Sequence, residues 1–98
     1  MKPVVLTRDA AAELAQGRRW YDAQVDGLGS EFVAEFRRAA ASIGDYSAAA
    51  VVLARGYRRC MLRRFPYGLV YLEKAEVLLV VALWHSARDP KTLWKRLR

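Results

Sequence analysis

The sequence predicts an α+β fold in which an N-terminal strand and an antiparallel helical hairpin pack on a mostly antiparallel sheet, followed by a short tail. A short apolar run, Val4–Leu6, precedes two segments whose apolar residues recur every three or four positions. After Gly44 the spacing changes to the alternation of strands, which continues to His85. With 98 residues in all, we expect a single domain spanning residues 1–98.

The two helical segments have recognisable starts and ends. Thr7 suits the N-cap of the first helix, in which Gly17 is a weak point. Residues 26–30 contain two glycines and predict a tight connection to a second helix, which Gly44 ends. The apolar face of this second helix is the clearest in the chain and comprises Leu28, Phe32, Phe36, Ala39 or Ala40, and Ile43.

The second half of the chain predicts strands. After a loop at residues 45–50, strands are expected from residue 51, over 57–65, over 69–73 and over 77–85. Pro66 and Gly68 predict a turn around Tyr67, and residues 74–75 predict the tip of a hairpin. Because residues 77–85 are apolar on both faces, we expect a central strand covered on one side by the helices.

Composition excludes several classes of protein. The single cysteine, Cys60, allows neither an internal disulfide nor a metal cluster, so we expect a reducing, cytoplasmic location and no cofactor or metal. The longest apolar run, residues 77–84, is far shorter than the roughly 20 residues that span a bilayer. The N-terminus does not resemble a signal peptide.

Positive charge is concentrated in the second half of the chain. Residues 1–50 hold six Lys/Arg and seven Asp/Glu (6 − 7 = −1), whereas residues 51–98 hold eleven and three (11 − 3 = +8). In the predicted strand 57–65, alternation places arginines on both faces. Glu73 and Glu76 are too few to pair with all four of the arginines, which are Arg58, Arg59, Arg63 and Arg64. This surplus predicts an anionic partner.

Several segments occur in an order that is typical of one family. They are Tyr21, GLGSEF at the start of the second helix, Ile43, YRRCMLRRFPYGLVY, VLLVVALWH, and ARDP followed by Trp94 and Arg96. From about residue 11 to residue 96 the chain resembles the RelE/ParE superfamily of type II toxin–antitoxin toxins, and the ParE branch in particular. RRFPYGLVY and ALWHSARDP are the most specific parts of this resemblance.

The resemblance implies both a fold and a function. It implies a curved sheet and a toxin that acts on DNA gyrase and leaves the enzyme trapped on DNA. It also implies a cognate, ParD-like antitoxin, encoded beside the toxin, whose C-terminal segment lies across the toxin. The N-terminal part of that antitoxin binds the operator, so operator DNA is reached only through the antitoxin.

The alternative is a RelE-like, ribosome-dependent mRNA endonuclease, which needs cations for the phosphate and a residue that moves a proton. If the chain is such a ribonuclease, its candidate catalytic residues are Arg59, Arg63, His85 and Arg88. RelE nucleases typically carry a proton-shuttling residue such as tyrosine in the tail, whereas this tail reads PKTLWKRLR. We therefore favour inhibition by binding, with His85 hydrogen-bonded to the start of the tail.

The candidate contact residues form two sets. Candidate antitoxin contacts, on the hairpin groove, the sheet edge and the basic strand, are Val4, Leu28, Phe32, Arg58, Arg59, Arg63 and Arg64. Candidate target contacts are Tyr67, Arg88, Lys95 and Arg96. Cys60 is expected to be a small buried residue, not a nucleophile. A toxin that has lost its activity and only binds its antitoxin is a third possibility.

Overall fold

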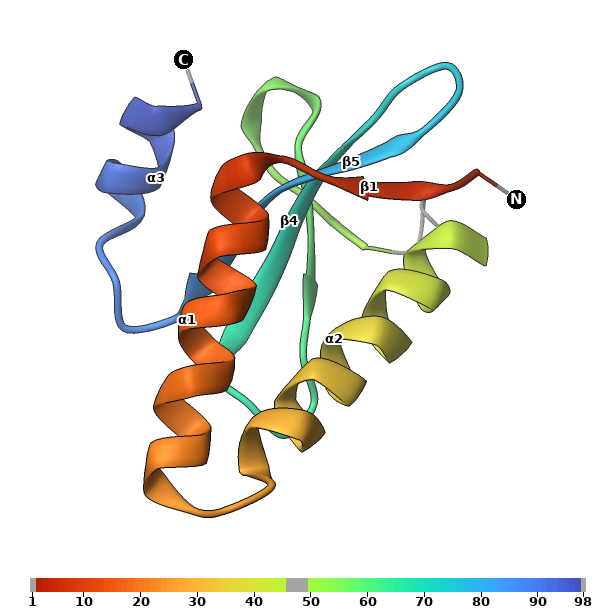
Figure 1. Ribbon diagram of the computed structural model, residues 1–98. Coiled ribbons are helices and arrows are strands. Elements are labelled where there is room, and N and C mark those ends of the chain that lie inside the picture. Colours follow the sequence, from red (N-terminus) through yellow and green to blue (C-terminus); the bar gives the residue numbers. More distant parts are fainter. Residues whose placement is uncertain (1, 46–49, 98) are drawn as a thin grey trace.

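The computed structural model describes residues 2–45 and 50–97, which form three layers (Figure 1). The central layer is a five-stranded sheet in the order β1-β5-β4-β3-β2. Its strands are β1 (Val4–Leu6), β2 (Val51–Val52), β3 (Arg58–Met61), β4 (Tyr67–Glu73) and β5 (Leu78–His85). Helices α1 (Arg8–Gln24) and α2 (Leu28–Asp45) cover one face, and the short helix α3 (Pro90–Arg96) packs on the other. The predicted α+β architecture is confirmed.

The helical hairpin is held together at two glycines. A Cβ atom at Gly17 would lie 2.5 Å from Cε2 of Phe32, so the glycine lets the two helices approach closely. At the turn, the backbone N–H of Gly29 donates to Oδ1 of Asp22 at 2.7 Å. The predicted cap is confirmed, because the N–H of Ala10 donates to Oγ1 of Thr7. Gly17 is therefore a packing contact as well as a weak point of the helix.

Strand β5 lies in the interior of the sheet, parallel to β1 and antiparallel to β4. Its register with β4 shifts so that Val70 pairs with Ala82 and Tyr71 with Val80, leaving Val81 as a bulge. The middle strand of the five is β4, and β5 is covered on both faces, by the hairpin and by α3. The sequence predicts cover by the helices on one side only; the second cover comes from the C-terminal tail, which docks on the sheet as α3.

Two apolar clusters lie on the two faces of the sheet. The larger one joins the hairpin to the sheet through Phe32, Phe36, Leu69, Tyr71 and Leu83. The smaller one, on the opposite face, joins Val70, Val81, Ala82 and Trp84 to Leu93 of α3. Among the described residues, no helix is long and apolar enough to cross a membrane.

The strand predicted over residues 57–65 is too long. It ends at Met61, and the chain then bends through residues 62–66 before β4 begins at Tyr67. The side chain of Phe65 turns into the hairpin core, with its ring centroid 4.8 Å from that of Tyr21 and 5.2 Å from that of Phe32. The turn therefore precedes Tyr67 instead of surrounding it. The loop predicted at 45–50 falls mostly on residues 46–49, outside the described residues.

Candidate functional site

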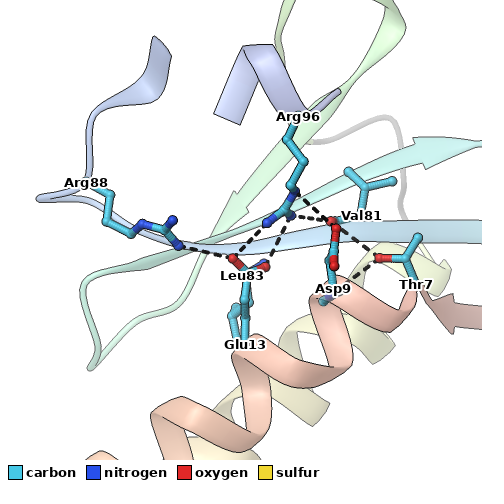
Figure 2. A network of polar contacts seen from close by, with 8 residues as sticks. Thr7, Asp9, Glu13, Val81, Leu83, Arg88 and Arg96 are labelled. Atoms are coloured by element: carbon cyan, nitrogen blue, oxygen red, sulfur yellow. Dashed lines mark hydrogen bonds and ion pairs between the residues drawn. The ribbon is translucent and has the colours of Figure 1, made fainter. Parts of the chain in front are cut away.

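A carboxylate on α1 joins the sheet to the C-terminal segment. The side chain of Glu13 is only 11% exposed, and its carboxylate accepts a hydrogen bond from the backbone N–H of Leu83 at 3.1 Å. Figure 2 shows the same carboxylate between two guanidinium groups: Nη1 of Arg88 lies 3.2 Å away and Nη1 of Arg96 lies 3.0 Å away. Glu13 is not recognisable as a site residue from the sequence, because it lies 70 residues from Leu83 and only the fold brings its partners to it.

Arg96 completes this cluster from α3. Its Nη2 donates to the carbonyl oxygen of Val81 at 2.6 Å, and its Nε lies 3.7 Å from Oδ2 of Asp9. Oγ1 of Thr7 donates to the same carbonyl at 3.4 Å (Figure 2). Strand β1 pairs with β5 only as far as Val80. Past that point, the side chains of Thr7, Glu13 and Arg96 provide the hydrogen bonds to the β5 backbone at Val81 and Leu83 that a neighbouring strand would otherwise make. We call Asp9, Glu13, Arg88 and Arg96 the Glu13 cluster.

A groove lies between α3 and the face of the sheet that the hairpin leaves uncovered. Its volume is about 430 Å³, and we call it the α3 groove. Its lining residues are Leu53, Arg59, Met61, Gly68, Val70, Trp84, Ser86, Arg88, Pro90, Leu93 and Trp94. Most of the lining is apolar, and both of its charged residues are arginines. An apolar wall with a few charged groups is the usual make-up of a binding site.

His85 lies at the end of β5, beside a second, shallower hollow of about 230 Å³ that Tyr67 and Arg88 also line. The His85 and Tyr67 rings meet edge to face at 4.9 Å. The N–H of Ala87 donates to Nδ1 of His85 at 3.0 Å, which confirms the predicted hydrogen bond to the start of the tail. Neutral His85 therefore carries its proton on Nε2, and in this tautomer it has no free lone pair with which to act as a base.

The predicted ribonuclease residues are only partly brought together. His85 and Arg88 line the same hollow, and Arg88 also lines the α3 groove together with Arg59. Arg63 lies in the bend after β3 and lines neither space. Burial raises the pKa of the Tyr67 hydroxyl, a shift that Arg88 partly opposes, so Tyr67 is a poor base near neutral pH.

The four arginines around β3 are less in surplus than the sequence suggested. Nη2 of Arg64 pairs with Glu31 at 2.8 Å, and the N–H of Arg64 donates to the buried carboxylate of Glu35. Arg58, on the hairpin face opposite Tyr71, is also engaged within the molecule. The acidic partners of Arg64 come from α2, whereas the sequence offered only Glu73 and Glu76. Within the described part of the chain, Arg59 and Arg63 form no ion pair.

The apolar residues predicted to contact an antitoxin do not form one surface. Val4 lines a hollow of about 270 Å³ between β1 and the end of α2. Leu28 lies at the opposite end of α2, roughly 27 Å away at about 1.5 Å per residue. Phe32 was misplaced on the surface: its side chain is 0% exposed, because it fills the space over Gly17. Lys95 is exposed on α3, whereas Arg96 is half-buried in the Glu13 cluster.

Neither a thiol nor a metal centre is indicated. The side chain of Cys60 packs against the larger apolar cluster, and burial raises the pKa of its thiol, which disfavours the nucleophilic thiolate. Among the described residues, no group of three or more His, Cys, Asp or Glu side chains is placed to hold a metal ion.

A family model described as "ParE toxin of type II toxin-antitoxin system, parDE" matches residues 4–90. The chain belongs to this ParE toxin family. The ParE fold agrees with a solved structure titled "Chromosomal ParDE TA system from P. aeruginosa", with a TM-score of 0.76 over 87% of this chain and 96% of that chain. At 17% identity this likeness concerns the fold alone. A search of the curated proteins finds no significant match.

Proposed function

We propose that this ParE toxin inhibits DNA gyrase by binding to it in the cytoplasm, and that a cognate ParD-like antitoxin neutralises it. The observation that carries this proposal is the family match over residues 4–90, which includes all five strands and both long helices. The gyrase target and the antitoxin come from what the ParE family does. The toxin needs no cofactor and no metal for this activity.

The geometry around His85 supports binding over catalysis. A ribonuclease of the RelE type requires a group that takes the proton from the attacking hydroxyl. His85 accepts the N–H of Ala87 at Nδ1, so its neutral form has no lone pair left for that task. The aromatic residue of the tail, Trp94, packs edge to face on Tyr57 at 6.1 Å, and its indole has no group that gains or loses a proton near neutral pH.

The ribonuclease remains the second candidate because of one observation: Tyr67, His85 and Arg88 line the same hollow. If this hollow held a scissile phosphate, Arg88 would stabilise its charge. Pulse-labelling of bacteria after induction of the toxin alone separates the two candidates. We expect thymidine incorporation to fail before methionine incorporation. An earlier loss of methionine incorporation would favour the ribonuclease instead.

The antitoxin is tested by coexpression. The product of the reading frame beside the toxin gene is expected to restore growth and to elute with the toxin on gel filtration as one complex. A toxin that elutes alone and still arrests growth in the presence of that product would argue against a ParD-like partner from that gene.

A further inference from the structure

The α3 groove has the properties of a peptide-binding site. Its floor is the smaller apolar cluster, and Met61, at its edge, is 45% exposed. Arg59 crosses this floor: its Cδ would lie only 2.9 Å from a Cβ at Gly68, so the glycine makes room for the arginine stem. An exposed methionine beside an apolar floor is typical of surfaces that bind peptides.

The charge of the groove selects an anion. Arg59 and Arg88 line it, and none of its lining residues is acidic. Arg59 has no ion-pair partner among the described residues, and Arg88 uses Nη1 for Glu13, which leaves other donors of its guanidinium free. A carboxylate entering the groove would meet Arg59, which no acidic side chain of the described residues engages, next to Arg88, which is shared with Glu13.

A buried donor in the same groove also lacks a partner. The side chain of Trp84 is 7% exposed, and its indole N–H has no hydrogen-bond acceptor among the described residues. Because this nitrogen is itself inaccessible, Trp84 is not a hydrogen-bonding contact for a ligand, but its ring lines the groove and reports on whether the groove is occupied.

The lining favours a peptide over a nucleic acid. Single-stranded nucleic acid is held by exposed rings that stack on its bases and by a track of cations. Here the guanidinium carbon of Arg88 already covers the Trp84 ring at 3.7 Å, and Trp94 packs on Tyr57. Two arginines among mostly apolar residues suit a peptide that offers one or two carboxylates next to an aliphatic or aromatic side chain.

We propose that the α3 groove binds a segment of the antitoxin in which an acidic residue flanks an apolar one, with the carboxylate on Arg59 and the apolar side chain on the groove floor beside Trp84. This inference rests on the proposed function, since it presumes that an antitoxin binds the toxin. It adds the place and the chemistry of one contact. It also separates Arg59 from Arg63, which the sequence treated alike.

The test uses ¹⁵N-labelled toxin and the protein encoded beside it, with affinity measured by titration calorimetry. Arg59→Gln is expected to weaken binding about tenfold, the loss of one charge-assisted contact. The matched control is Arg63→Gln, which removes an exposed, unpaired arginine outside the groove and is expected to leave the affinity unchanged. Binding is also expected to shift the indole resonance of Trp84, assigned with Trp84→Phe, and not that of Trp20.

Equal affinity of wild type and Arg59→Gln, with the Trp84 resonance unmoved, would overturn the groove site and leave the antitoxin proposal intact. Failure of the wild-type toxin to bind the neighbouring protein would overturn both. A 12-nucleotide single-stranded RNA that shifts the Trp84 resonance in place of the antitoxin would overturn the peptide assignment in favour of a nucleic acid.

Discussion

Gly17 shows how one missing side chain sets the distance between two helices. A methyl group there would lie 2.5 Å from Cε2 and 2.8 Å from Cζ of Phe32, which itself has no exposed surface. The Phe32 ring is fixed by Tyr21 and Phe65, so it cannot move aside without disturbing the larger apolar cluster.

Gly17→Ala is therefore expected to destabilise the protein by about 1–3 kcal/mol, although alanine is the better helix former. Urea unfolding followed by circular dichroism measures the change. Gln16→Ala, one position earlier and exposed, is the control and should stay within about 0.5 kcal/mol of the wild type. A stabilised Gly17→Ala protein would mean that the helices are farther apart than described.

His85 separates the two candidate functions. In His85→Asn, the amide oxygen can take the place of Nδ1 and accept the N–H of Ala87, while the imidazole that would move a proton is removed. We expect growth arrest by this variant at close to the wild-type level of induction. A loss of activity of about 10²-fold or more, in a variant with wild-type thermal stability, is what removal of a general base would give.

The reactivity of the Cys60 thiol tests whether this side chain is packed against the larger apolar cluster, on the hairpin side of β3. Burial raises the pKa of its thiol, so the thiolate forms at higher pH in the folded protein than in urea. Folding therefore favours the neutral thiol, and this contribution to stability is lost as pH rises through the raised pKa. The rate of alkylation by iodoacetamide should rise with pH along a curve displaced upward from that of the unfolded chain. A downward displacement would contradict the described packing.

At the level of the elements, the least predictable part of the chain was the attachment of α3. Asp89, Pro90 and the apolar residues that follow them in the sequence predict a short helix. The structure contains this helix, and Oδ1 of Asp89 caps it by accepting the N–H of Lys91. Its anchor depends on Glu13 and on the bulge at Val81. No periodicity in the sequence relates these residues, because they meet only after the sheet has formed.

The helices and the hairpin of β4 and β5 were predictable because local signals specify them. Thr7, the glycines at 27 and 29, and the alternation after Gly44 each act within a few residues. The length of β3 was not predictable from the sequence, because the alternation of strand residues continues to Phe65. In the structure β3 ends at Met61, and the Phe65 ring packs on Tyr21 and Phe32 instead of continuing the strand. The acidic partners of the arginines were missed for the same reason: they lie on helices far away in the chain.

Glu13→Gln tests the cluster that joins α1, β5 and α3. The amide can still accept one hydrogen bond, but the charge that holds both guanidinium groups is lost, so we expect a destabilisation of about 2 kcal/mol. The matched control is Glu31→Gln, which removes an exposed pair with Arg64 and should cost about 0–1 kcal/mol. Thermal unfolding compares the two, and equal effects would show that the Glu13 cluster contributes no more than a surface pair.

Across the whole molecule, the charge asymmetry of the sequence is partly neutralised between layers. Acidic groups of the hairpin pair with arginines that follow β3 or β5, as in Glu31 with Arg64 and Glu13 with Arg88. Arg59, in the α3 groove, and Arg63 are among the cations of the described structure that have no ion-pair partner. The formal net charge of +7 still favours association with acidic partners, whether an antitoxin or gyrase bound to DNA.

The proposed action of the toxin on gyrase, by binding alone, can be tested with purified components. The most direct measurement incubates purified toxin with purified gyrase and relaxed plasmid DNA, and follows supercoiling and gyrase-linked DNA breaks on a gel. The same toxin is incubated in parallel with ribosomes programmed with mRNA. We predict that it inhibits supercoiling, accumulates broken DNA bound to gyrase and leaves the mRNA intact. Cleaved mRNA together with unimpaired supercoiling would contradict the account.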